Sequence, residues 1–162
     1  MSSWEAIGKS DDWYTPAYIF RALRVTFDLD VAAPPCGPRH VPCRAWFHEG
    51  ALQRGWEGFV WMNPPYGPRN GLAPWMTKFI RHGNGIALVP DRTSAPWFQE
   101  AARQMGAILF VSPKIKFERP DGTHGKSPGT GSALMALGTQ AIAALERASS
   151  LGLLVYPKQE GV

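Results

Sequence analysis

The chain is 162 residues long, which suits one domain with its own core and leaves no length for a second domain of ordinary size. Its 7 Trp, 8 Phe and 4 Tyr exclude a disordered linker, and its apolar runs are too short to predict a membrane-spanning helix. A net charge of +4 permits a nucleic-acid partner without requiring one. Two cysteines, with no signal-peptide pattern at the start, predict a cytoplasmic protein.

The first half of the chain is predicted to form one helix and three strands. The helix runs to Arg24, with Thr15 as its N-cap and Pro16 at the first helical position, where proline is favoured. The segment 34–55 is loop-rich. Strands are predicted over residues 25–31, 44–48 and 58–62.

The second half alternates short apolar runs with amphipathic stretches, which predicts an α/β fold with a mostly parallel sheet and crossover helices. Such sheets place their chemistry at the carboxyl ends of the strands, where Asp30, Asn63 and Asp91 fall. Ser94 is the expected cap of the second of three further helices. These helices cover residues 74–82, 94–105 and 140–148, and the strands cover 85–89, 107–111, 132–137 and 151–156.

The tetrapeptide Asn63-Pro64-Pro65-Tyr66 is the strongest motif of the chain. Prolines cannot donate to a sheet, so the preceding strand must end there. A proline-rich turn with a surface tyrosine is the simpler interpretation. The position of the motif, directly after a hydrophobic strand, favours a site instead.

This motif resembles the signature of amino-group methyltransferases that use S-adenosylmethionine. Further segments resemble the small phage DNA N6-adenine methyltransferases of the Dam type, namely 11–16, 27–33, 59–62, 87–93 with Trp97-Phe98, and Lys116-Phe117. The resemblance implies a compact Rossmann-like methyltransferase fold over residues 11–162, after an N-terminal extension of residues 1–10. It also implies DNA as the partner and, for a phage protein, the host cytoplasm as the location.

The residues of the motif suit this chemistry. The lone pair of an adenine amine is delocalised into the ring, so the amine is a poor nucleophile until acceptors engage its N–H groups. The Asn63 side-chain oxygen and the Pro64 carbonyl are the predicted acceptors, and Pro65 helps to fix the backbone beside them. Tyr66 is expected to stack on the base after it has left the helix.

The resemblance implies that two segments face the methionine end of the cofactor: Trp13, Tyr14, Thr15 and Pro16, and the loop of Asp30, Val31 and Ala32. Thr15 offers a hydroxyl and helix N-terminal N–H groups to the cofactor's carboxylate. Asp30 offers an acceptor to its ammonium group, with Asp28 as the second choice. A plain N-cap and a loop carboxylate are the alternatives for Thr15 and Asp30.

The residue that holds the cofactor's ribose is less clear, because no glycine-rich loop follows the first strand. Glu49 is the candidate, and a solvated surface glutamate is an equal alternative.

Contacts to DNA phosphates are expected from the loop after the motif and from the polar loop 112–131, unless the latter is a plain solvated crossover. With no room for a target-recognition domain, loops 67–73 and 112–131 must read the sequence, which predicts a short or relaxed recognition site. The candidate residues are Arg69, Asn70, Lys114, Lys116, Arg119 and Lys126.

Other interpretations stay open. Cys36, His40, Cys43 and His48 are close in sequence, but their spacing lacks the paired halves of common zinc sites, so no metal is expected. A methyltransferase acting on cytosine N4 or protein glutamine is one rival, and a catalytically silent DNA-binding relative is another. Homodimer formation is left open.

Overall fold

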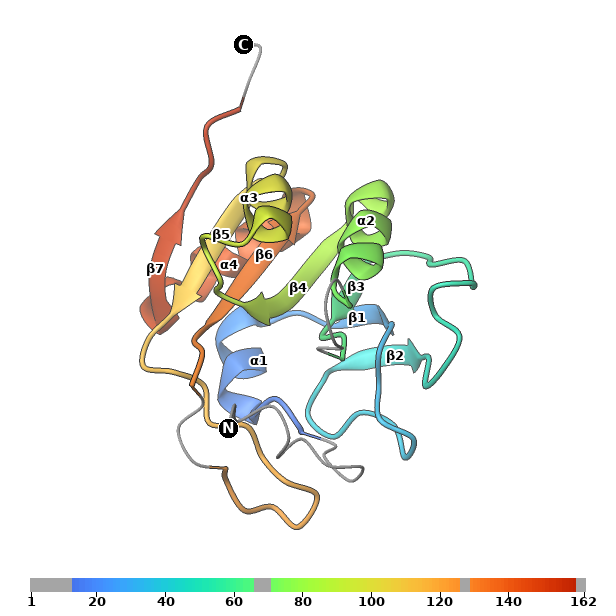
Figure 1. The fold of residues 1–162 in the computed structure, drawn as a ribbon. Helices are drawn as coiled ribbons and strands as arrows, with labels where there is room; N and C mark the ends of the chain where they lie inside the picture. The colour runs from blue at the N-terminus through green and yellow to red at the C-terminus, as the bar shows by residue number, and fades with distance from the viewer. Residues whose placement is uncertain (1–12, 66–70, 126–128, 160–162) are drawn as a thin grey trace, which may run out of the picture.

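The computed structural model describes residues 13–65, 71–125 and 129–159, and these form a seven-stranded sheet with helices on both faces (Figure 1). The strand order across the sheet is β2-β1-β3-β4-β6-β5-β7. The strands are β1 (Phe27–Asp30), β2 (Cys43–Trp46), β3 (Val60–Met62), β4 (Gly85–Pro90), β5 (Ala107–Val111), β6 (Ser132–Leu137) and β7 (Gly152–Val155). The helices are α1 (Ala17–Leu23), α2 (Ala73–His82), α3 (Pro96–Arg103), α4 (Thr139–Arg147) and the short 3₁₀ turn η1 (Ser149–Leu151).

The sheet has a parallel half and an antiparallel half. Strands β2, β1, β3 and β4 run parallel to one another, which confirms the predicted α/β sheet. Strand β6 runs antiparallel to both β4 and β5, and β7 runs antiparallel to β5. This second arrangement was not predicted. It arises because the loop after β5 returns the chain without a helix, so that β6 lies against β5 in the opposite direction.

Two hydrophobic layers hold the helices on the sheet. On one face α1 and α4 pack their apolar residues, such as Phe20 and Leu145, against Trp61 and Leu109. On the other face α2 and α3 pack on β3, β4 and β6 in the same manner. Strand β4 is buried along its whole length, as expected for a central strand covered on both faces. None of the described helices is long and apolar enough to span a bilayer.

The connections around β2 are irregular, as the predicted loop-rich segment requires. Four prolines between β1 and β2 remove the backbone donors that a crossover helix needs.

The connection from β2 to β3 is instead fixed to α2 by side chains. Lys78 Nζ donates to the carbonyl of Leu52, at 3.1 Å, and to that of Arg54, while Trp56 Nε1 donates to the carbonyl of Ala51 at 2.9 Å.

The two predicted helix caps are wrong. The N-cap of α1 is Pro16 and that of α3 is Ala95, and neither helix has a side-chain cap. Ala95 precedes a proline, which pushes its backbone into the extended region and so places the cap one residue after Ser94. The hydroxyl of Thr15 has another partner, described below.

Candidate active site

The carboxyl ends of three adjacent parallel strands meet at one edge of the sheet. Asp30 is the last residue of β1, Asn63 directly follows β3 and Asp91 directly follows β4. Asp30 lies opposite Trp61 in the register of β1 and β3. The predicted gathering of polar residues at this edge is therefore confirmed for these three positions.

A hollow that is open to solvent lies at this edge. Its walls come from three places: the segment before α1, the ends of β1 and β3, and the proline-rich connection from β1 to β2. The lining residues are Trp13, Tyr14, Thr15, Asp30, Ala32, Pro34, Pro38, Arg39, His40, Val41, Trp61 and Asn63. Five residues predicted for cofactor binding and the predicted catalytic asparagine thus face one space.

Asp30 is the buried charged group of this hollow, with only 3% of its surface exposed. Its Oδ1 accepts a hydrogen bond from the backbone N–H of Ala32 at 3.1 Å. Loss of solvent raises the pKa of the Asp30 carboxyl to about 7, and the hydrogen bond from Ala32 lowers it only in part. Asp28, the second choice, is exposed and lies outside the hollow, where its Oδ2 accepts from the backbone N–H of Phe59 at 2.8 Å.

Thr15 and Asn63 are in direct contact inside the hollow. The Asn63 Nδ2 group donates to Thr15 Oγ1 at 3.3 Å, and Thr15 is 5% exposed. This hydrogen bond explains why Thr15 does not cap α1, because its hydroxyl is engaged with the residue that follows β3. Pro64 is buried and Pro65 is exposed next to it.

A turn of the polar loop lies beside the segment before α1, and we call residues 117–125 the strap (Figure 1, orange). Tyr14 and Glu118 exchange two backbone hydrogen bonds, of 2.8 and 2.9 Å. The guanidinium of Arg39 lies 3.9 Å from the centre of the Tyr14 ring and donates to the carbonyls of Arg119 and Pro120, at 2.9 and 2.6 Å. The strap therefore packs against Tyr14 and Arg39, two residues that line the hollow.

The charged side chains of the strap contact residues within the strap and residues next to it. Arg119 donates to the carbonyl of His124 at 2.9 Å, and its guanidinium lies 5.2 Å from the centre of the Trp13 ring. His40 Nε2 lies 2.9 Å from a carboxylate oxygen of Glu118, close enough for an ion pair but without the alignment of a hydrogen bond. The side chains of Lys114 and Lys116, just before the strap, are exposed.

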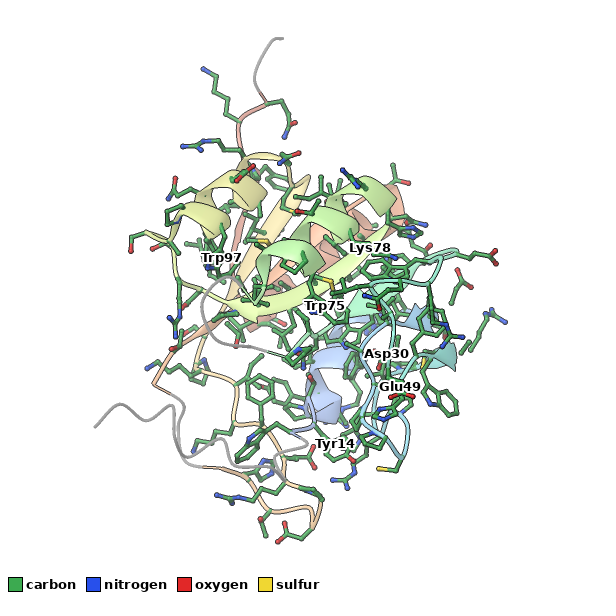
Figure 2. All side chains as sticks on the ribbon, turned by 45° about the vertical axis from the view of Figure 1, so that its right-hand side comes forward. Tyr14, Asp30, Glu49, Trp75, Lys78 and Trp97 are labelled. Atoms are coloured by element: carbon green, nitrogen blue, oxygen red, sulfur yellow. The ribbon has the colours of Figure 1, made fainter. Side chains whose placement is uncertain are left out.

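Three other residues predicted for the cofactor do not line the hollow. Pro16 is buried at the start of α1, and Val31 packs into the core between the sheet and α2. Glu49 is exposed beyond the carboxyl end of β2, the strand next to β1 (Figure 2). Tyr66, Arg69, Asn70 and Lys126 lie outside the described residues.

The sequence-based prediction missed the second wall of the hollow, formed by Pro34, Pro38, Arg39, His40 and Val41. These residues follow the strand that ends in Asp30, and their prolines were a signal that the chain stays irregular there. The side chain of Arg39 carried no comparable signal, because its partners Tyr14 and Pro120 are remote in sequence.

The cysteines and histidines considered for zinc have other surroundings. The Tyr14 hydroxyl lies 3.2 Å from Cys36 Sγ, and burial together with the charge of Asp30 raises the pKa of the Cys43 thiol to about 11. The described part of the chain holds no group of three metal-ligating side chains suited to an ion.

The fit of the strap against Trp13 gives a testable prediction. A Cβ at Gly125 would lie 2.7 Å from Trp13 Cζ3, so Gly125→Ala must displace the Trp13 ring from the wall of the hollow. Overpacking of this kind costs about 1–3 kcal/mol, and we expect the affinity for S-adenosylmethionine to fall about fivefold or more in calorimetry. Gly129→Ala is the matched control, since a Cβ there meets nothing within 4 Å. Equal affinities of the two variants would refute the role of the strap.

The profile of the family described as "DNA N-6-adenine-methyltransferase (Dam)" matches residues 4–148. The chain belongs to this family. The Rossmann-like methyltransferase fold implied by the sequence resemblance agrees with the α/β sheet described above.

A curated relative of this Dam-family chain is the "DNA N-6-adenine-methyltransferase" of Escherichia phage T1. The two are 28% identical over 109 residues, a stretch that covers 62% of this chain and 44% of the relative. The chain therefore spans less than half the length of that relative.

Proposed function

We propose that this chain transfers the methyl group of S-adenosylmethionine to the exocyclic N6 amine of adenine in DNA. The observation that carries the proposal is the position of the Asn63 amide, which lines the same hollow as the buried carboxyl of Asp30. The fold thereby brings two groups to one edge of the sheet: Asn63, which can accept from an amine, and Asp30, whose carboxylate can bind a cationic cofactor. The Dam-family match supports adenine in DNA as the target.

The chemistry of the residues lining the hollow suits S-adenosylmethionine, which when bound would supply an electrophilic methyl group on sulfur. Asp30 is a buried acidic group without a cationic partner among the described residues. Because a buried carboxylate is stabilised by a neighbouring cation, the ammonium group of the cofactor would suit this position. The rings of Trp13 and Tyr14 offer apolar walls. Glu49, beyond the carboxyl end of β2, is the proposed acceptor for the ribose hydroxyls, and Thr15 is the proposed contact of the carboxylate.

The catalytic contribution of the chain is to orient the amine. The Asn63 Oδ1 atom and the Pro64 carbonyl accept from the two N–H groups, which favours a pyramidal nitrogen with its lone pair exposed. Fixed acceptors of this kind cost no reorganisation as positive charge develops on the nitrogen. Proline restricts the backbone at positions 64 and 65, so the carbonyl stays in place.

Adenine can reach this edge only outside the base stack, so we propose that the base is flipped, with Tyr66 stacking on it. Within this chain, we assign contacts to the DNA sequence to the loops around the hollow. Lys114 and Lys116 are the proposed phosphate contacts of the described residues, because both side chains are exposed just before the strap.

Charge reversal tests the DNA side. The double change Lys114→Glu and Lys116→Glu is expected to weaken DNA binding and to make the salt slope of log K shallower by about 2, since each lost phosphate contact removes about 0.9. Fluorescence anisotropy at several salt concentrations measures both effects. Lys158→Glu, an exposed lysine beyond β7, serves as the control and should keep the wild-type slope. An unchanged slope in the double variant would remove both lysines from the interface.

The function itself is tested by transfer of a tritiated methyl group to unmodified DNA, followed by nucleoside analysis. We expect the label in N6-methyladenine. Label in N4-methylcytosine or in protein would move the chain to another class of amino methyltransferase. DNA binding without label would identify a catalytically silent relative.

A further inference from the structure

One contact in the hollow has no place in the mechanism described so far: the hydrogen bond between Asn63 and Thr15. Both residues line the hollow, and they are 48 positions apart in the chain. Thr15 stands before α1, whereas Asn63 follows β3. The bond therefore links the proposed cofactor segment directly to the proposed catalytic amide.

The Thr15 side of this contact is held firmly from behind. Its neighbour Tyr14 is paired through both backbone hydrogen bonds with Glu118 and is covered by the guanidinium of Arg39. Its other neighbour is a proline with a restricted backbone, and Thr15 itself is 5% exposed. The Thr15 hydroxyl is thus a fixed point that accepts a hydrogen bond from the Asn63 side chain.

The Asn63 side chain needs such a tie because its amide has two ends of similar shape and opposite function. One end donates through Nδ2 and the other accepts through Oδ1. Thr15 Oγ1 takes a hydrogen bond from Nδ2 at 3.3 Å, and no described residue donates to Oδ1. Because the Thr15 hydroxyl can also donate, it fixes the place of the Asn63 side chain, and the orientation observed is the one that leaves Oδ1 free to accept.

We propose that Thr15 is a positioning residue, whose hydroxyl holds the Asn63 amide with its oxygen free to accept from the substrate amine. This proposal rests on the proposed function. It assigns to the segment before α1 a second task besides lining the cofactor site. It also explains why a buried threonine stands where a helix cap was expected.

The kinetic test compares Thr15→Val with Thr15→Ser. Valine keeps the shape and removes the acceptor, so kcat at saturating cofactor and DNA should fall about tenfold or more, as misplaced catalytic groups cost up to about 10². Serine keeps the hydroxyl and should restore most of kcat. Calorimetry gives the cofactor affinity of each variant, so that a loss of binding is separated from a loss of kcat. A wild-type kcat in Thr15→Val would overturn the proposal.

A second readout does not depend on activity. The Asn63 side-chain amide signals, assigned in ¹⁵N–¹H NMR spectra by their loss in Asn63→Ala, should exchange slowly with water in the wild type and in Thr15→Ser. Exchange should become fast in Thr15→Val, and fast exchange in the wild type would refute the contact. If the wild type methylates no adenine, the proposed function fails and the role of Thr15 fails with it. If Thr15→Val methylates adenine at the wild-type rate, the role of Thr15 alone fails.

Discussion

Replacement of Asn63 by alanine is expected to lower kcat for methyl transfer by about 10²- to 10³-fold, the usual cost of losing one fixed polar group that stabilises developing charge. The variant loses the side-chain acceptor for the amine while the walls of the hollow and the buried Asp30 stay in place. Cofactor affinity, measured by calorimetry, should therefore remain within a few fold of the wild type.

The matched control for this variant is Asn84→Ala. Asn84 directly precedes β4 and so lies at the amino end of the parallel strands, opposite the hollow. It should keep the wild-type kcat. Near-wild-type turnover in Asn63→Ala would contradict the assignment of the motif.

The second large effect is expected from Asp30→Asn, which should raise the free energy of unfolding and lower the affinity for the cofactor. The pKa of Asp30 in the fold is about 7, above its usual value of 3.8, so the fold favours the neutral carboxyl. The contribution of Asp30 to the free energy of unfolding is fully present below the pKa that the carboxyl has in the unfolded chain. It is lost as the pH rises through the pKa that the carboxyl has in the folded protein. Asp30→Asn removes that loss.

We therefore expect Asp30→Asn to unfold with a larger free energy than the wild type, by about 2 kcal/mol at pH 5 and by up to about 4 kcal/mol at pH 8. Urea denaturation of the cofactor-free protein at the two pH values measures this difference. A difference that does not grow between pH 5 and pH 8 would mean that the Asp30 carboxyl titrates normally.

Binding should change in the other direction. The ionised carboxylate is the form that binds an ammonium group, so the wild-type affinity for S-adenosylmethionine should rise about tenfold from pH 5.5 to 7.5, below the pH at which a free α-amino group loses its own proton. Asp30→Asn should bind about 10- to 100-fold more weakly at pH 7.5, as a charge-assisted hydrogen bond is worth about 1.5–3 kcal/mol. Its affinity should be nearly independent of pH.

Asp28→Asn is the control for this experiment, because Asp28 lies on the same strand but outside the hollow. It should keep the rise in affinity with pH. If Asp28→Asn lost that rise and Asp30→Asn kept it, the assignment of the ammonium site to Asp30 would be wrong.

Local sequence patterns were enough to predict the strands and the edge of the sheet that carries the site. The strands over 107–111 and 132–137 were placed to the residue, because each is an apolar run with clear breaks at its ends. Asp30 and Asn63 were recognised as strand-end residues for the same reason. The direction of β6 and β7 was not predictable, since it depends on which strands pair across the sheet.

The second wall of the hollow was missed because its residues act through contacts that are long-range in sequence. The Arg39 guanidinium lies over the Tyr14 ring and donates to the carbonyl of Pro120. The spacing of these residues in the sequence does not predict either contact. Thr15 was expected to cap a helix, and only the folded chain brings Asn63 to its hydroxyl. The strap was read as a polar loop, whereas its backbone pairs with Tyr14.

The central claim is that the hollow presents an acceptor to the N6 amine of adenine. The most direct measurement compares two DNA fragments of one sequence, one made with ordinary adenine and one with N6-methyladenine at every adenine position, as acceptors of a tritiated methyl group. We predict label in the first fragment and only background in the second. Equal labelling of both fragments would place the methyl group elsewhere and contradict the account.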